Sequence, residues 1–123
     1  MKYTEKVMER FKHPKYLGEL ENPDAKGKVG NPVCGDIMEI QLEIKDDIIK
    51  DIKVKTFGCV AAITTSDVVC EFALNKHVDE ALKITKDEVV KHFGELPPEK
   101  IHCSLLALDA LKKAINEYKS KEK

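Results

Sequence analysis

The chain has 123 residues, 42% hydrophobic and 35% charged, and its 21 basic and 22 acidic side chains leave a formal net charge of -1. This length fits a single domain over residues 1–123, and the balanced charge with only one arginine excludes the basic surface of a nucleic-acid-binding protein. No apolar run approaches the roughly 20 residues that cross a bilayer, and the charged first residues lack the apolar centre of a secretory signal. We therefore expect a cytoplasmic protein without membrane attachment.

The first predicted element is a short amphipathic helix over residues 1–11. Its apolar residues Tyr3, Val7 and Phe11 recur at helical spacing, and a proline follows shortly after them. The next segment, residues 16–32, is rich in glycine, proline, asparagine and aspartate. This composition is typical of irregular chain or of a ragged edge strand.

A β-hairpin is predicted next. Apolar and polar residues alternate over residues 37–44, which is the period of a half-buried strand. Residues 45–47 have turn chemistry, although they lack the glycine of the tightest hairpins. The chain then returns over residues 48–57, with Ile52 and Val54 expected on the buried face.

Helices are predicted over most of the remaining chain. The first follows Cys59 and runs to about Leu74, with one buried face that includes Cys70, which we expect to be a core residue. Residues 75–94 are expected to hold one or two short helices. The last helix is predicted over residues 104–118, followed by a frayed tail. Its buried stripe is expected to consist of Ala107, Ala110, Leu111, Ala114 and Tyr118. These elements together predict an α+β fold.

The positions of three of the four cysteines indicate a metal site. In a reducing compartment, cysteines indicate metal binding or catalysis more often than disulfides. Cys34 precedes the first strand of the hairpin and Cys59 follows the second, so antiparallel pairing places both at one edge. Cys103 lies near the start of the last helix and joins them if that helix packs on the sheet. We expect the three sulfur atoms to meet in one exposed pocket, and such soft ligands select zinc, copper(I) or an iron–sulfur cluster.

Two other residues are candidates for a fourth ligand. Asp36 follows Cys34 by two positions, and His102 is adjacent to Cys103. Because Cys59 and Cys103 begin helices, the positive end of the helix dipole favours their thiolate forms. The remaining histidines are expected to be ordinary surface residues: His13, His77 and His92.

Three separated motifs resemble those of one known family. Residues 33–36 (VCGD), 55–59 (KTFGC) and 96–104 (LPPEKIHCS) are similar to the signature of the IscU/NifU-type iron–sulfur cluster assembly scaffolds, and the similarity extends over the whole chain in order. The resemblance implies a SufE/NifU-like fold, with a three-stranded antiparallel sheet carrying helices on one face. The third strand would come from residues 16–32.

The resemblance also implies a set of ligands and partners. Cys34, Cys59 and Cys103 would hold a [2Fe-2S] cluster, with Asp36 or His102 completing the set at different stages. Cys103 would accept sulfur as a persulfide from a cysteine desulfurase, an iron donor would supply iron, and the cluster would pass to apo iron–sulfur acceptor proteins. Such a chain is an assembly scaffold and sulfur carrier, not an enzyme. A homodimer of the cluster-bound form is left open.

Two positions carry further expectations. Oxygen is a poorer ligand than sulfur for cluster iron, so Asp36 is hypothesised to be the point at which the cluster is released. In the family, the loop that corresponds to residues 96–100 (LPPEK), here called the proline loop, is bound in an extended conformation by a specialised heat-shock chaperone. The best-known form of that loop has valine where this chain has Glu99. Since such chaperone grooves prefer apolar side chains, Glu99 is expected to weaken that partnership.

Two other classes of protein compete with the scaffold. A zinc-bound, SufU-type sulfur acceptor would use Cys34, Asp36, Cys59 and Cys103, or His102 as the fourth ligand. That branch carries an insertion between the second and third cysteines and lacks the histidine before the last one. This chain has no obvious extra segment between Cys59 and Cys103, and it has His102, so both features favour the scaffold. Zinc would then be an adventitious or regulatory ion. A stand-alone enzyme with a cysteine nucleophile would need His102 as its base, but adjacent residues usually point apart.

Overall fold

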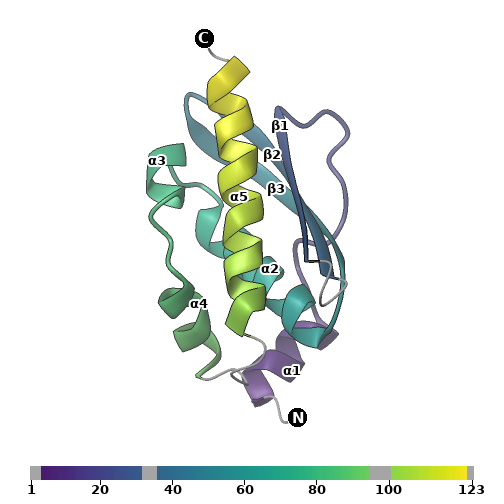
Figure 1. Cartoon of the computed structure of the whole chain (residues 1–123). Helices are drawn as coiled ribbons and strands as arrows, with labels where there is room; N and C mark the ends of the chain where they lie inside the picture. Colours follow the sequence, from purple (N-terminus) through teal and green to yellow (C-terminus); the bar gives the residue numbers. More distant parts are fainter. Residues whose placement is uncertain (1–3, 32–35, 95–100, 122–123) are drawn as a thin grey trace.

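The computed structural model describes residues 4–31, 36–94 and 101–121 (Figure 1). Its elements in chain order are α1 (Glu5–Lys12), β1 (Ala25–Asn31), β2 (Asp36–Lys45), β3 (Ile48–Phe57), α2 (Val60–Ala73), α3 (Val78–Ala81), α4 (Lys86–Phe93) and α5 (Ile101–Lys121). The strands form one three-stranded antiparallel sheet, as the family resemblance implied, and their order is β1-β2-β3. The long helix α5 lies along the sheet, with α3 and α4 on the side away from β1 (Figure 1).

The predicted hairpin is confirmed, and its turn is tighter than expected. Lys45 pairs with Ile48, so only Asp46 and Asp47 connect β2 and β3. Both aspartates have positive φ, 55° and 62°, which is the left-handed conformation that a two-residue hairpin turn requires. Aspartate tolerates this conformation better than most residues do because its short side chain bonds locally. The turn therefore forms without glycine.

The segment predicted as irregular chain or an edge strand contains β1, the third strand of the sheet. Gly27 in this strand lies against the backbone of α5. A Cβ atom added there would fall 2.2 Å from the carbonyl oxygen of Ala110 and 2.4 Å from the backbone nitrogen of Ala114. Only glycine lets the helix approach the strand this closely, so Gly27 sets the position of α5 on the sheet.

Helix α2 differs from the prediction of a single buried face. Ten of its 14 residues are buried, because it packs against β3, α5 and α1 on different sides. Three of the buried residues are the hydroxyl residues Thr64, Thr65 and Ser66. Each donates a hydrogen bond to a carbonyl one turn earlier in the helix, at 2.9, 2.6 and 2.8 Å. These bonds allow polar side chains to lie inside the protein.

The prediction for the last helix was wrong at both ends. Helix α5 begins at Ile101, three residues earlier than predicted, and continues to Lys121 instead of fraying after Tyr118. Its last turns are held by side chains: the Tyr118 hydroxyl donates to Asp47 at 2.8 Å, and Lys119 pairs with Asp79 at 2.5 Å. None of the helices in the described ranges is long and apolar enough to span a membrane.

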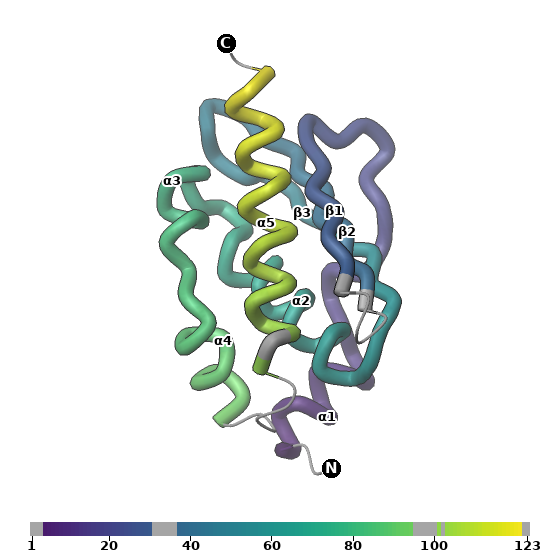
Figure 2. Tube along the Cα trace, viewed as in Figure 1, coloured from purple at the N-terminus to yellow at the C-terminus, as the bar shows by residue number. Residues whose placement is uncertain are grey.

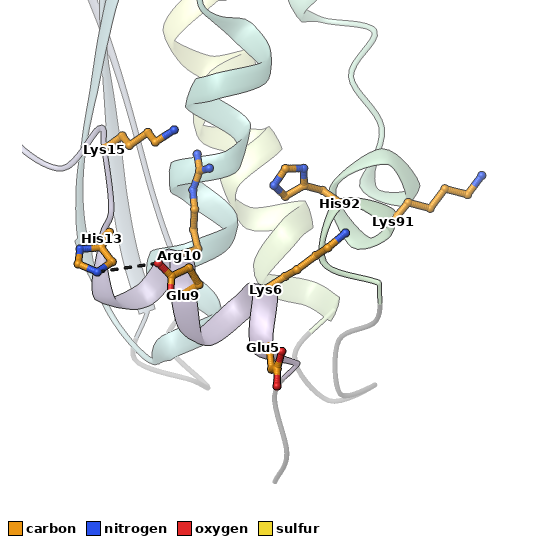
Figure 3. Close-up of a pocket in the computed structure, with 8 residues that line it drawn as sticks. All are labelled: Glu5, Lys6, Glu9, Arg10, His13, Lys15, Lys91 and His92. Atoms are coloured by element: carbon orange, nitrogen blue, oxygen red, sulfur yellow. Dashed lines mark ion pairs between the residues drawn. The ribbon is translucent and has the colours of Figure 1, made fainter.

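The N-terminal helix α1 is attached through both a buried apolar residue and a charged residue. Of the predicted apolar stripe, Val7 is buried, Phe11 is 36% exposed, and Tyr3 lies outside the described residues. Arg10 instead points from α1 toward α2 (Figure 3) and forms an ion pair with Asp67, 2.6 Å from Nε to Oδ2. The Asp67 side chain is fully buried and also accepts a hydrogen bond from the backbone of Tyr16 at 2.6 Å. The apolar prediction failed for Phe11 because this ion pair decides which side of α1 faces the protein.

Candidate metal centre

Two of the predicted site cysteines meet in the structure. Cys59 is the N-cap residue of α2, and Cys103 is the third residue of α5. Their Sγ atoms lie 4.0 Å apart, although 44 positions separate them in the sequence. Figure 2 shows the start of α5 and the turn between β3 and α2 at the same end of the molecule. The expected approach of the last helix to the hairpin is thus observed for this pair.

The separation of the two sulfur atoms suits a shared metal ion. A disulfide would require about 2.05 Å, so the two thiols are not bonded to one another. Two sulfurs bound tetrahedrally to one ion at about 2.3 Å would lie about 3.8 Å apart. The observed 4.0 Å is close to that value. Cys59 and Cys103 are therefore placed to bind the same zinc or iron atom with little rearrangement.

A hydroxyl pair supports the turn that carries Cys59. The Oγ1 atom of Thr56, near the end of β3, lies 3.0 Å from the Oγ atom of Ser66 in α2. Ser66 donates its own proton to the carbonyl of Ala62 at 2.8 Å, so Thr56 is the donor to Ser66. The bond joins the strand before Cys59 to the helix after it. The short connection through Gly58 is thereby held at both ends.

The two sulfurs differ in their access to solvent. Cys103 is fully buried, whereas Cys59 is half-buried. The expectation of one exposed pocket was therefore wrong for Cys103. The sequence held the signal, because Cys103 continues the buried stripe of α5 at the spacing of Ala107, Ala110 and Ala114. A donor can reach the sulfur of Cys103 only after a rearrangement that exposes it.

The other predicted ligands are described only in part. Cys34 lies outside the described residues, and the side chains of Asp36 and His102 are likewise not described. The backbone of Asp36 begins β2, and the next residue, Ile37, pairs with Phe57. The strand that follows Cys34 in sequence thus begins beside the end of β3, two residues before Cys59. Within the described residues no group of three or more histidine, cysteine or acidic side chains could hold a metal ion.

The fourth cysteine has a structural role. Cys70 is fully buried in α2, as predicted for a core residue. Burial raises the pKa of its thiol far above the ordinary value, and the negative charge of Asp67 raises it further. Since the thiolate is the form that binds metals and attacks electrophiles, burial and the raised pKa both oppose a reactive or ligating role for Cys70 in the folded protein.

Two histidines expected to be ordinary surface residues have structural roles. His77 is the N-cap of α3, where its Nδ1 atom accepts a hydrogen bond from the backbone of Asp79 at 3.1 Å. The His92 ring makes edge contacts with Phe72 and Phe93, with centroids 5.6 and 5.3 Å apart. Burial lowers the pKa of His92, so its neutral form is favoured in the folded state. The acidic residues after His77 were the sequence signal for a helix start.

A wide groove lies between α1 and α4 (Figure 3). It has a volume of about 790 Å³, and none of the described residues that line it is a cysteine. Its cationic side chains are offset by acidic ones: Arg10 pairs with Asp67 and Glu71, and Lys15 lies 3.9 Å from Glu71. The groove therefore has no strong charge of one sign and no constellation suited to catalysis.

Comparison with known proteins relates this geometry to a family. Residues 2–123 match the family described as the NifU-like N terminal domain. The iron–sulfur cluster assembly scaffold protein IscU 1 of Archaeoglobus fulgidus is 52% identical over 116 residues, which cover 94% of this chain and 76% of that protein. The scaffold protein IscU of Escherichia coli K12 is 45% identical over 125 residues, covering 98% of this chain and 97% of that protein.

A solved structure agrees with the fold. A crystal structure from Fervidobacterium islandicum, of a protein described as a cluster assembly scaffold for the SUF system, superposes with a TM-score of 0.79. The match covers 92% of this chain and 96% of that one, at 23% sequence identity. The likeness at this identity concerns the fold alone, and it supports the SufE/NifU-like architecture with its three-stranded antiparallel sheet.

Proposed function

Because the chain belongs to the NifU-like N-terminal domain family, among the IscU/NifU-type scaffolds, we propose that it serves as the surface on which a [2Fe-2S] cluster is assembled and from which the cluster is transferred. Iron and sulfur are the cargo of this process, and the protein supplies ligands that hold them and later release them. In this role the chain is a scaffold and sulfur carrier, not an enzyme.

The observation that carries the proposal is the 4.0 Å separation of the Cys59 and Cys103 sulfur atoms. The two thiols come from different elements and are held at the distance that a shared iron atom requires. We assign Cys34 as the third thiolate, since the strand that follows it starts beside the end of β3. Asp36 or His102 supplies the fourth ligand.

Sulfur delivery needs a partner. A cysteine desulfurase would transfer sulfur as a persulfide, and Cys103 is the proposed acceptor. Because Cys103 is fully buried, binding of the desulfurase must expose its sulfur for this transfer. An iron donor and apo iron–sulfur acceptor proteins complete the proposed set of partners.

Two proposals concern release and regulation. A carboxylate is a harder and weaker ligand for cluster iron than a thiolate, so Asp36 marks the position where an acceptor cysteine can enter. Asp36→Ala should slow transfer of a preformed cluster to an apo-ferredoxin, and an unchanged rate would remove this role.

Glu99 lies outside the described residues, and weak binding to a heat-shock chaperone that recognises the proline loop remains a prediction.

Anaerobic reconstitution tests the proposed function. The reduced protein is incubated with ferrous iron, a cysteine desulfurase and cysteine, and the visible absorption of a [2Fe-2S] cluster is followed. The wild-type protein should gain the spectrum and pass the cluster to an apo-ferredoxin. Cys59→Ser and Cys103→Ser should abolish stable loading, because each removes one of the two paired thiolates.

Cys70→Ser is the matched control, since it changes a cysteine of the same chain that lies outside the pair. This variant should load normally. A colourless wild-type product with one tightly held zinc ion, formed even when iron and sulfur are in excess, would instead favour the zinc-bound sulfur acceptor. The test uses metal-free protein because thiolate sites readily scavenge zinc.

A further inference from the structure

We propose that Cys59 resolves a persulfide carried by Cys103, releasing sulfide and leaving a disulfide between the two residues. The inference rests on the proposed function, because it assumes that sulfur arrives as a persulfide. It goes beyond that function by giving the scaffold a reducing step of its own. The observation behind it is the 4.0 Å separation of the two sulfur atoms, which places a second thiol beside the sulfur that carries the cargo.

The reaction balances without an outside reductant. The Cys59 thiolate attacks the inner sulfur of the persulfide, which is the Sγ atom of Cys103. The Cys59–Cys103 S–S bond forms, and the bond between Sγ of Cys103 and the outer sulfur breaks. The outer sulfur leaves as HS⁻ with its own proton and the bonding electron pair. Cys59 and Cys103 are oxidised together to the disulfide, and the outer sulfur is reduced from the sulfane to the sulfide level.

The geometry favours this step over attack by a thiol from solution. The inner sulfur of the persulfide is the Cys103 Sγ atom itself, so its distance from Cys59 is the one observed in the structure. Holding two reactants in contact replaces a slow bimolecular encounter with an intramolecular reaction. Hydrosulfide is also a better leaving group than an ordinary thiolate, because its conjugate acid is more acidic. Cys70 cannot compete, since it is buried in α2 and its raised pKa keeps it protonated.

The difference in burial assigns different roles to the thiols of Cys103 and Cys59. Cys103 is fully buried and belongs to the packed face of α5, so a persulfide there is shielded from thiols in solution. Cys59 is half-buried and caps a helix after a short turn, where its side chain makes no capping hydrogen bond. The side chain of Cys59 is therefore the one that can move over the remaining distance to form the bond.

The disulfide would have a direct consequence for assembly. It would occupy two of the three proposed thiolates and join the β3–α2 turn to α5. The scaffold would deliver one sulfide per chain and then stop until a dithiol reductant reopened the bond. The proposed step thus explains how a first sulfide can form before an electron donor binds, and it limits that supply to a single equivalent.

The test uses the full, metal-free, reduced chain under anaerobic conditions with a chelator present. Inorganic polysulfide or a desulfurase with cysteine supplies the sulfane sulfur, and excess donor is removed quickly. Sulfide release is then measured together with the intact mass of the unreduced protein. We expect about one sulfide per chain and a product two hydrogens lighter than the starting protein, with Cys59 and Cys103 in one cross-linked peptide. A parallel sample without donor must stay reduced.

Variants identify the resolving thiol. Cys59→Ser and Cys59→Ala should keep one extra sulfur on Cys103 and release less than about a tenth of the wild-type sulfide. Cys70→Ser, which changes a cysteine outside the proposed ligands, should behave like the wild type. The inference is overturned if loaded wild-type protein keeps the extra sulfur on Cys103, if the sulfur moves intact to Cys59, or if release depends on Cys34. If neither donor loads sulfur onto the wild-type protein, the proposed role of Cys103 as persulfide acceptor is rejected, and the inference is rejected with it.

Discussion

Gly27→Ala is predicted to push α5 away from the sheet and so to disturb the sulfur pair. The added methyl group would sit 2.2 Å from the carbonyl oxygen of Ala110 and 2.4 Å from the nitrogen of Ala114. Both are backbone atoms of α5, so no side-chain rotation can relieve the overlap. Helix α5 must retreat by about 0.8 Å even to bring the nearer contact to 3.0 Å, the lower limit for real Cβ atoms.

The expected loss of stability follows from two opposing effects. Overpacking a well-packed site costs about 1–3 kcal/mol, and the rigid backbone contacts place Gly27→Ala at the upper end of this range. Alanine also lowers the conformational entropy of the unfolded chain, which stabilises the folded state by about 0.4–1 kcal/mol. The net loss should be about 2 kcal/mol, which corresponds to a fall in Tm of about 8 °C for a chain of this length.

Thermal unfolding followed by circular dichroism measures this loss, and cobalt(II)–thiolate absorption reports on the sulfur pair. Gly94→Ala is the control, because its Cβ would meet nothing within 4 Å and only its positive φ of 85° adds strain. The control should lose about 1 kcal/mol and bind cobalt normally. A Gly27→Ala protein with wild-type stability and cobalt binding would refute the claim that this contact positions α5.

Three further predictions concern the buried side chains of Asp67 and Cys70 and the half-buried side chain of His92. Asp67→Ala should destabilise the protein by about 3–5 kcal/mol in urea denaturation, because it leaves Arg10 without its buried carboxylate, and Asp67→Asn should cost less. Equal losses of stability in the two variants would argue against the unpaired charge of Arg10 as the cause. Iodoacetamide should alkylate Cys59 but not Cys70 in the native protein at pH 8, since burial raises the Cys70 pKa; comparable rates would contradict its low reactivity. Because burial lowers the His92 pKa below 6.5, the unfolded chain binds that proton more tightly and stability should fall as pH drops below about 6.5. Thermal melts from pH 5 to 7.5 should show a weaker pH dependence for His92→Gln, and an identical slope would exclude this contribution.

Local patterns were sufficient to predict the hairpin and the position of helix α2 in the chain, although not the burial of α2 on several sides. The period of two in residues 37–44 and 48–57 is a property of each strand, and the turn between them needs only two residues that accept positive φ. The side chains of Ile52 and Val54 lie on the buried face as predicted. Such features depend on neighbours in the sequence, so the sequence alone can reveal them.

Features that depend on distant contacts could not be predicted in this way. Helix α5 extends to Lys121 because Tyr118 and Lys119 bond to residues of the hairpin tip and α3. The face of α1 is decided by the ion pair of Arg10 with Asp67, 57 positions away, and periodicity within α1 pointed to Phe11 instead. Propensity and pattern carry no information about such partners.

The same division applies to the site. The hairpin register predicted that Cys34 and Cys59 lie at one edge of the sheet, and the pairing of Ile37 with Phe57 is the described part of that edge. The approach of Cys103 depends on the contact of Gly27 with α5, which joins segments more than 80 residues apart in the sequence. The burial of Cys103 was not predicted because the helix was expected to begin at residue 104, whereas α5 begins at Ile101 and so places Cys103 on its apolar stripe.

X-ray absorption at the iron edge of the reconstituted protein tests the central claim most directly, namely that the sulfurs of Cys59 and Cys103 bind one iron atom of a binuclear cluster. The wild-type protein and Cys70→Ser should show a predominantly sulfur shell together with short iron–iron scattering. Loss of that scattering in both Cys59→Ser and Cys103→Ser should accompany the loss of thiolate ligands. Wild-type iron bound as isolated ions without iron–iron scattering, or full cluster signals in the Cys59→Ser and Cys103→Ser double variant, would contradict the account.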